Sequence, residues 1–307
     1  MTGTVLITGP TRGLGRAAVL AMAGRPSSVR PDLLLLGRGL SAVAAEARAL
    51  GARVEEVTAD LSRLADVRSA ATTVREMLDA GAVRPLRALV ANAGVMSADT
   101  RRASADGYEL TFAVNYLAHS QLIGDLVGSL TAPARVVLLG SNTYHANVWR
   151  RLLHVPEARW RDPLELARPA TGEAAPGQAA SGVAYSNAKL AILYYAHELQ
   201  RQAGPGIAVS VFEPGWMPGT DLGRDAPAAL RSIMRGVARL PGVSTPGKSG
   251  PALASLALDD RWAAARDGAF ILKDKIIDVQ PVAHDRNRER RLWAATTELL
   301  EHASTHS

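Results

Sequence analysis

The chain contains no cysteine among its 307 residues. This absence excludes disulfide bonds, thiolate metal sites and cysteine nucleophiles. No apolar run approaches the ~20 residues that a helix needs to cross a bilayer. The opening sequence MTGTVLITGP enters a strand-like run without the charged and long apolar regions of a signal peptide. We therefore expect a soluble, cytoplasmic protein with no membrane anchor and no metal site.

Lysine is scarce, since Lys189, Lys248, Lys273 and Lys275 are the only ones in the chain. Lysine and arginine together nevertheless number 35 against 29 acidic residues, which gives a formal net charge of +6. Such an excess can indicate a nucleic-acid partner. Here the arginines are scattered among alanines and leucines, without a long basic tract or interleaved aromatic residues. We expect no nucleic-acid partner, and the excess charge instead favours encounter with a polyanionic cofactor.

Short apolar runs alternate with longer segments of helical periodicity. The predicted strands are 4–8, 32–37, 53–59, 87–92, 135–140 and 207–215, and the predicted helices are 13–24, 40–50, 63–80, 106–130 and 183–203. Continuous apolar strands separated by helices are typical of a parallel sheet covered on both faces. Right-handed crossovers then make the sheet doubly wound. We predict a Rossmann-type α/β fold in a single domain, 1–307, with a C-terminal helix over 285–302.

Two segments interrupt this alternation. Residues 142–184 follow the fifth predicted strand and include the low-complexity run RPATGEAAPGQAASG, and residues 214–247, rich in Gly and Pro, follow the sixth. Open α/β sheets bind ligands at the carboxyl ends of their strands, so we predict that both segments are elaborated substrate-side loops. Their large apolar side chains favour a bulky, largely apolar substrate, and the alternative is that they pack a local core or a subunit contact. The candidate substrate residues are Asn142, Trp149, Trp216 and Met217. Trp160 is expected to line the wall of the same substrate pocket.

A glycine-rich turn, TGPTRGLG at 8–15, lies between the first predicted strand and the first predicted helix. Gly9, Gly13 and Gly15 let the backbone turn tightly and approach a pyrophosphate, whose charge the helix N-terminus favours. A plain strand–helix turn is the alternative interpretation. The position directly after an N-terminal strand favours a dinucleotide.

The end of the second predicted strand indicates which dinucleotide binds. NAD-binding folds usually place a carboxylate there for the ribose 2′-hydroxyl. This chain has Gly37 followed by Arg38, with Arg12 nearby in the glycine-rich turn. Each arginine could be an incidental surface residue in an arginine-rich chain. Two guanidinium groups without a carboxylate suit the 2′-phosphate of NADP, and together they predict NADP(H).

Several motifs occur in one order along the chain: TGPTRGLG at 8–15, NAG at 92–94, Asn115 in VNYLAH, Ser141 at the end of the fifth strand, and Tyr185 one helical turn before Lys189. Together they resemble the short-chain dehydrogenase/reductase family over nearly the whole chain. YSNAKLAILYYAHEL, FEPGWMPGT and RRLWAATTELL are similar to the branch that contains retinol dehydrogenases and light-dependent protochlorophyllide reductases.

The spacing of Tyr185 and Lys189 puts a phenol and a cation on the same helix face. Free tyrosine titrates at about pH 10, and a nearby positive charge favours its ionised form. We therefore interpret the pair as a tuned acid, the alternative being a surface pair on an amphipathic helix. The resemblance implies that Tyr185 exchanges a proton with the substrate oxygen and that Lys189 also holds the nicotinamide ribose. It further implies that Ser141 hydrogen-bonds the substrate oxygen and that Asn115 anchors a proton-relay water.

The resemblance also implies a cofactor pocket, in which NAG lines the wall and Asp60 meets the adenine amino group. The residues expected to contact NADP(H) are Gly9, Thr11, Arg12, Gly13, Leu14, Gly15, Arg38, Asp60, Leu61, Asn92, Ala93, Gly94, Tyr185, Lys189, Pro214 and Gly215. Taken singly, several of these polar residues could instead cap a strand or helix or form a turn. His119 and His145 are expected to make local hydrogen bonds only.

These residues predict an NADP(H)-dependent oxidoreductase, a ketoreductase or alcohol dehydrogenase, that acts on a small-molecule carbonyl or alcohol. The alternatives are a non-redox isomerase or cyclase and a catalytically silent NADP-binding regulatory protein. The chain departs from its branch in two ways. Protochlorophyllide reductases place functional cysteines near their pigment, so a pigment substrate is not expected here. Retinol dehydrogenases commonly carry an N-terminal membrane anchor, which we do not expect here. The sequence allows a homo-oligomer but does not predict one.

Overall fold

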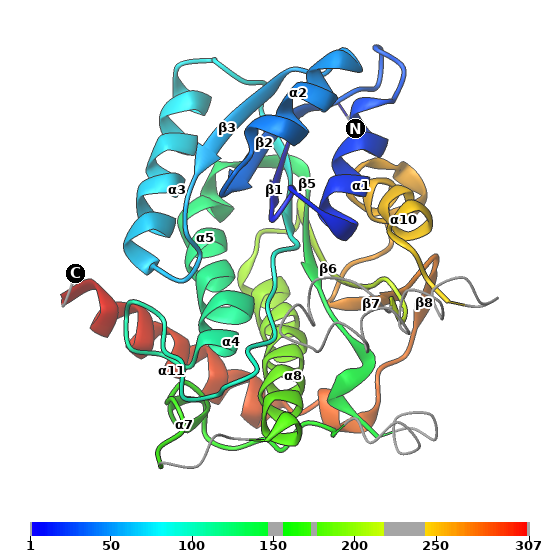
Figure 1. Cartoon of the computed structure of the whole chain (residues 1–307). Helices are drawn as coiled ribbons and strands as arrows, with labels where there is room; N and C mark the ends of the chain where they lie inside the picture. Colours follow the sequence, from blue (N-terminus) through cyan, green and yellow to red (C-terminus); the bar gives the residue numbers. More distant parts are fainter. Residues whose placement is uncertain (1, 147–155, 173–176, 218–242, 306–307) are drawn as a thin grey trace, which may run out of the picture.

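The computed structural model describes residues 2–146, 156–172, 177–217 and 243–305, and these build one eight-stranded sheet (Figure 1). The strand order is β3-β2-β1-β4-β5-β6-β7-β8, and neighbouring strands are parallel except β7 and β8. The strands are β1 (Thr4–Thr8), β2 (Asp32–Gly37), β3 (Val54–Thr58), β4 (Leu86–Ala91), β5 (Leu130–Leu139), β6 (Ile207–Glu213), β7 (Ala269–Leu272) and β8 (Lys275–Ile277). The predicted doubly wound, Rossmann-type sheet is confirmed.

Helices cover both faces of the sheet. Helices α1, α2 and α10 pack on one face, α3, α5 and α8 pack on the other, and α11 lies against α8 (Figure 1). The helices are α1 (Gly13–Ala23), α2 (Ser41–Ala49), α3 (Leu64–Asp79), α4 (Leu110–Phe112), α5 (Ala118–Leu126), α7 (Pro163–Leu166), α8 (Gln178–Gln202), α10 (Pro246–Leu258) and α11 (Arg286–Thr305). Shorter turns are the π-helical η1 (Ala113–Leu117) and the 3-10 turns η2 (Val127–Ser129), η3 (Asn142–Tyr144), η5 (Asp260–Trp262) and η6 (Pro281–Ala283).

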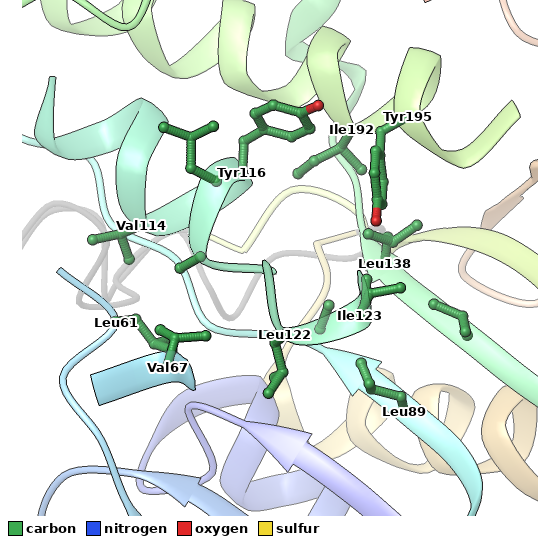
Figure 2. Close-up of a cluster of buried hydrophobic side chains, with 14 of the residues drawn as sticks. Leu61, Val67, Leu89, Val114, Tyr116, Leu122, Ile123, Leu138, Ile192 and Tyr195 are labelled. Carbon is green, nitrogen blue, oxygen red and sulfur yellow. The ribbon is translucent and has the colours of Figure 1, made fainter. Parts of the chain in front are cut away.

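Each face of the central strands contributes to a separate core, which explains why these strands are apolar throughout. In β1, Ile7 joins the core beneath α1 and α10, whereas Leu6 joins the core beneath α3 and α5. Figure 2 shows part of this second core, with Leu89 of β4 near Leu122 and Ile123 of α5. Each fully buried aliphatic side chain of this kind contributes roughly 1.5–3 kcal/mol. The two cores fix the sheet whose carboxyl edge carries the candidate site.

The loop predicted over 142–184 is partly helical. Helix α8 begins at Gln178 rather than at 183, after Gly177 in an extended conformation, because the alanines that follow are strong helix formers. Asp162 caps α7 by accepting a hydrogen bond from the Leu164 N–H. The second predicted loop, 214–247, likewise ends inside α10, which begins at Pro246.

The helix predicted over 106–130 is divided. Glu109 caps α4, since its side chain accepts a hydrogen bond of 2.7 Å from the Phe112 N–H, and the helix therefore starts later than predicted. The π-helical turn η1 then precedes α5, which ends at Leu126, and β5 starts at Leu130 rather than at 135. A π-helical turn inside a helix is often found at functional sites, and this one contains Asn115.

The sequence patterns missed α10, β7 and β8. The run AFILKDKII forms β7, a turn and β8, and each of these strands is too short for a periodicity to develop. Helix α10 packs against α1, with Gly250 so close to Ala17 that a side chain there would clash. Across the described segments, no helix combines the length and apolarity required to span a bilayer.

Candidate active site

The glycine-rich turn joins β1 to α1 at the carboxyl edge of the sheet. Gly9 and Gly13 adopt φ values of 62° and 53°, in the left-handed region that favours glycine. A Cβ on Gly15 would clash with the Gly9 carbonyl oxygen. Thr11 is half-buried and Arg12 is exposed in the turn. Leu14 is buried in the core beneath α1, so any cofactor contact from it would come from its backbone.

Asn92 ties the end of β4 to the glycine-rich turn. Its Nδ2 donates hydrogen bonds to the main-chain oxygens of Thr8, at 2.9 Å, and of Gly9, at 3.0 Å. The N–H groups of Asn92 and Ala93 both donate to Thr8 Oγ1, at 3.0 Å and 2.9 Å. These bonds hold the NAG segment, which ends at Gly94, beside the turn between β1 and α1.

Arg38 follows β2 and forms an ion pair with Asp60, with 2.8 Å between Nη1 and Oδ2. The Arg38 side chain is 68% exposed and that of Asp60 is 28% exposed. Partial burial disfavours the charged form of Asp60, but hydrogen bonds from Ser62 and the guanidinium outweigh it, so the pKa of Asp60 lies below its ordinary value. Leu61 is buried in the core beneath α3. Arg38, which is predicted to bind the 2′-phosphate, is thus paired with Asp60, which is predicted to bind the adenine amino group.

Asn115 lies buried in the π-helical turn η1. Its Oδ1 accepts a hydrogen bond of 2.7 Å from the Val95 N–H, and its Nδ2 donates one of 2.8 Å to the Val95 carbonyl. Both polar ends of the amide are therefore used to hold the segment that follows Gly94.

His119, one turn further along, contacts that same carbonyl, with 3.1 Å between its Nδ1 and the oxygen of Asn115. Its Nε2 lies 2.9 Å from Thr8 Oγ1. Because Thr8 Oγ1 already accepts two main-chain hydrogen bonds, its own hydrogen points to Nε2. The proton of the imidazole is therefore on Nδ1. Burial lowers the pKa of His119 to about 4, so it is neutral and links the glycine-rich turn to η1.

Lys189 is the most deeply buried cation of the site, with 2% of its surface exposed. Its Nζ donates a hydrogen bond of 2.7 Å to the Leu139 carbonyl at the end of β5. The same Nζ lies 5.4 Å from the centroid of the Tyr185 ring. Burial lowers the pKa of Lys189 to about 8, and the negative charge of Glu213 partly opposes that fall. Tyr185 and Lys189, which were predicted to act as a pair, therefore lie together at the end of β5.

Ser141 lies two residues beyond β5 and caps η3, because its Oγ accepts a hydrogen bond of 3.3 Å from the Thr143 N–H. Its side chain is half-buried, as is that of Asn142. Ser141 therefore lies close to Lys189 in the fold, because the last residue of β5, Leu139, provides the carbonyl that Lys189 binds.

The last residue of β6, Glu213, is a functional candidate that the sequence patterns missed. Glu213 is only 6% exposed; its Oε2 accepts a 2.7 Å hydrogen bond from the Asn142 N–H and its Oε1 a 3.0 Å bond from the Gly215 N–H. The signal in the sequence is a single carboxylate at the end of an apolar strand, which is costly to bury unless it is paired. Gly215 has φ 83°, and the Pro214 carbonyl accepts a hydrogen bond from Ser249 of α10.

The candidate substrate residues divide into three groups. Trp216 is 51% exposed, and Met217 is partly buried against the core beneath α1 and α10. Trp160 packs edge-on against Tyr194 of α8, with 4.8 Å between ring centroids. This contact favours the alternative in which Trp160 packs a local core. Trp149 lies outside the described residues.

The chain is similar to known oxidoreductases. Residues 3–148 match the family model described as short chain dehydrogenase. Human retinol dehydrogenase 13 is 28% identical over 97% of this chain and 84% of its own length. The chloroplastic protochlorophyllide reductase A of Oryza sativa subsp. japonica is 28% identical over 97% of this chain and 80% of its own. A short chain dehydrogenase from Burkholderia cenocepacia J2315, solved in complex with NADP, shares the fold with a TM-score of 0.62 at 22% identity, covering 88% of this chain and 95% of that one.

Proposed function

We propose that this chain, which belongs to the short-chain dehydrogenase/reductase family, is an NADP(H)-dependent oxidoreductase acting on a carbonyl or alcohol group. The observation that carries the proposal is the buried Lys189 ammonium beside the Tyr185 ring at the carboxyl end of β5. A cation placed there stabilises a phenolate more than a phenol. A pure binding protein has no use for such a pair.

Tyr185 is the proposed general acid in reduction and the general base in oxidation. When a ketone is reduced, its oxygen gains negative charge, and the phenol transfers its proton to that oxygen. The Lys189 ammonium, 5.4 Å from the ring centroid, offsets the charge that this transfer leaves on the tyrosine. Ser141 donates a hydrogen bond to the same substrate oxygen and fixes its position relative to the phenol. Tyr185 is then reprotonated at the expense of Lys189, and the relay water held by Asn115 restores to Lys189 the proton that it gives up.

The residues around the glycine-rich turn fit a nicotinamide dinucleotide. A Cβ built on Gly13 would meet no atom within 4 Å, so the backbone at the start of α1 faces open space. The first turn of α1 contains no acidic side chain, and its N–H groups favour a pyrophosphate. The cofactor, when bound, supplies or accepts the hydride. Arg12, Arg38 and Asp60 would hold its adenosine end, and Lys189, Pro214 and Gly215 its nicotinamide end.

The preference for NADPH over NADH should depend on Arg38. Its guanidinium is exposed and bound to Asp60 in an ion pair, and an exposed pair of this kind contributes at most about 1 kcal/mol. A 2′-phosphate can therefore displace the carboxylate. Because a charge-assisted hydrogen bond contributes about 1.5–3 kcal/mol, Arg38→Ala should raise the KM for NADPH about tenfold and leave the KM for NADH nearly unchanged.

Steady-state kinetics with both cofactors measures this effect. The matched control is Arg48→Ala, because Arg48 is also an exposed arginine in an ion pair, with Glu56, and lies away from the glycine-rich turn. Equal use of NADPH and NADH by the unmodified protein would show that the assignment of NADP is wrong.

We further propose a bulky, largely apolar substrate. Trp216 directly follows the Pro214–Gly215 turn, and an aromatic side chain left half exposed at a ligand-binding edge suits an apolar ligand. A ligand that covers about a third of the exposed indole surface gains roughly 1 kcal/mol. Trp216→Ala should therefore raise the KM about fivefold for bulky apolar ketones and leave that for small ketones unchanged.

The control for this variant is Leu50→Ala, which removes an apolar side chain of similar exposure at the end of α2, on the opposite edge of the sheet. Equal effects of Trp216→Ala on small and bulky ketones would exclude Trp216 from the substrate pocket.

A screen tests the function itself. Purified protein is mixed with NADPH and a panel of ketones and aldehydes that differ in size and polarity, and the absorbance of NADPH is followed. We expect oxidation of NADPH with at least one bulky apolar ketone. A binding-only protein would leave the absorbance unchanged throughout the panel.

A further inference from the structure

His119 joins two parts of the candidate site that are far apart in the sequence. Its imidazole belongs to α5 and is 2% exposed. The ring Nδ1 lies 3.1 Å from the main-chain oxygen of Asn115, and Nε2 lies 2.9 Å from Thr8 Oγ1. The second contact is not local, because 111 positions separate the two residues. One buried side chain therefore connects the π-helical turn η1 to the end of β1.

These contacts close a ring of hydrogen bonds around the NAG segment (92–94). Thr8 Oγ1 accepts hydrogen bonds from the first two N–H groups of that segment, at 3.0 Å and 2.9 Å. Asn115 Oδ1 accepts one of 2.7 Å from the N–H of Val95, which directly follows the segment. Thr8 and Asn115 thus hold the NAG segment at its two ends. His119 contacts both of them and completes the ring.

The two imidazole nitrogens have different roles in this ring. Thr8 Oγ1 already accepts two N–H bonds, so its own hydrogen points to Nε2, which acts as an acceptor. The proton of the ring is then on Nδ1, which donates to the Asn115 carbonyl. Burial lowers the pKa of His119 to about 4, so the ring stays neutral near pH 7. A single neutral imidazole therefore satisfies one buried hydroxyl and one buried carbonyl.

The groups on the two sides of the imidazole serve different parts of the site. Thr8 directly precedes Gly9 of the glycine-rich turn, and its carbonyl accepts a hydrogen bond of 2.9 Å from Asn92 Nδ2. This side is where the cofactor is proposed to bind. Asn115 is proposed to hold the relay water that serves Lys189. The acceptor Nε2 thus faces the cofactor half of the site, and the donor Nδ1 faces the catalytic half.

We propose that His119 is a positioning residue whose two nitrogens serve two separate steps. Nε2 holds the Thr8 end of the NAG segment for cofactor binding, and Nδ1 holds the turn that contains Asn115 for turnover. This role rests on the proposed function, in which the glycine-rich turn binds NADP(H) and Asn115 serves Lys189. His119 is not proposed to touch substrate or cofactor, because it acts only through Thr8 and Asn115.

Two substitutions separate the two nitrogens. In His119→Asn, the side-chain NH₂ takes the place of Nδ1 and keeps a donor for Asn115, but nothing reaches Thr8. In His119→Gln, the side-chain oxygen takes the place of Nε2 and keeps an acceptor for Thr8, but no donor faces the Asn115 carbonyl. Each variant therefore leaves one buried polar group without its partner, which is costly.

The expected result is a split between Kd and kcat. His119→Asn should raise the Kd for NADPH about tenfold and leave kcat within about twofold of its original value. His119→Gln should lower kcat about tenfold and leave the Kd for NADPH within about twofold. Fluorescence titration with NADPH measures Kd, and steady-state kinetics at saturating NADPH measures kcat.

A purely structural role would not produce this split. The matched control is His197, a second buried histidine, whose Nδ1 lies 3.0 Å from Oε1 of Glu289 where α8 meets α11. His197→Asn and His197→Gln should lower Tm without separating Kd from kcat. Parallel changes of Kd and kcat in the two His119 variants, or the same split in the His197 variants, would overturn the proposal.

The tautomer of His119 can be measured without any variant, which matters if the substitutions prevent folding. The chain has seven histidines, and in protein labelled with nitrogen-15 their ring signals are assigned by through-bond correlation to each backbone. Near pH 7 we expect a neutral His119 ring with its proton on Nδ1. A proton on Nε2, or a charged ring, would overturn the proposal.

Failure of the proposed function would be recognised separately. If the unmodified protein bound NADPH but turned over no ketone, the oxidoreductase proposal would fail. The Kd values of His119→Asn and His119→Gln would still decide the role of Nε2: a rise confined to His119→Asn supports it, and an equal Kd in the two variants contradicts it.

Discussion

Tyr185→Phe should lower kcat by about 10²–10⁴-fold, the range by which a positioned general acid accelerates proton transfer. The change removes one hydroxyl and keeps the ring beside which Lys189 lies. The glycine-rich turn, Asn92 and the Arg38–Asp60 pair are untouched, so the Kd for NADPH should stay within about twofold. Stopped-flow turnover together with quenching of intrinsic fluorescence by NADPH measures both quantities.

Tyr194→Phe is the matched control, because it makes the same change further along α8. The Tyr194 hydroxyl donates its hydrogen bond to the Val282 carbonyl, beside α11. Its loss should affect stability without changing turnover. A Tyr185→Phe protein with most of its activity would remove Tyr185 from the mechanism.

Lys189→Met should lower kcat by about 10²–10³-fold, as expected for the loss of a preorganised charge next to the reacting group. The variant should also raise the KM for NADPH, since Lys189 is proposed to hold the nicotinamide ribose. Methionine keeps most of the volume of the buried chain, so the core around Leu139 is preserved. Lys248→Met replaces an exposed lysine of α10 and should change neither constant.

The pH dependence has a defined sign. Burial places the pKa of Lys189 at about 8, below the ordinary value for lysine of about 10.4. The ammonium is therefore charged below pH 8 and loses its charge as the pH rises through that value. We expect kcat to fall on the alkaline side with a midpoint near 8 in the unmodified protein, and a rate that keeps rising through that range would contradict the role of Lys189.

Local sequence patterns predicted the fold and much of the candidate site. The apolar runs of β1 and β2 are buried on both faces, and a strand in that environment must be apolar throughout. The φ values of Gly9 and Gly13 are equally local, because the turn after β1 sets them within a few residues. The close approach of Gly9 to Ala93 and of Gly15 to Asn92 instead depends on the end of β4. The spacing of Tyr185 and Lys189 is a property of a single helix.

Contacts between distant segments could not be predicted in this way. The Glu213 carboxylate accepts hydrogen bonds from the N–H groups of Asn142 and Gly215, and only the folded sheet brings the Asn142 segment to Glu213. The edge-on contact of Trp160 with Tyr194 of α8 likewise joins a long insertion to a helix, and periodicity in either segment alone does not predict it. Short elements such as β7 and β8 offer too few residues for a pattern and form because β6 provides an edge to pair with.

Transfer of deuterium from cofactor to substrate tests hydride transfer most directly. NADPH carrying deuterium at the transferred position of its nicotinamide ring is incubated with the protein and the best ketone of the panel, and the alcohol is analysed by mass spectrometry. We expect an alcohol with one deuterium on its carbinol carbon from the unmodified protein and almost none from Tyr185→Phe. A product formed without deuterium, or formed equally by Tyr185→Phe, would contradict an NADPH-dependent reduction in which Tyr185 supplies the proton.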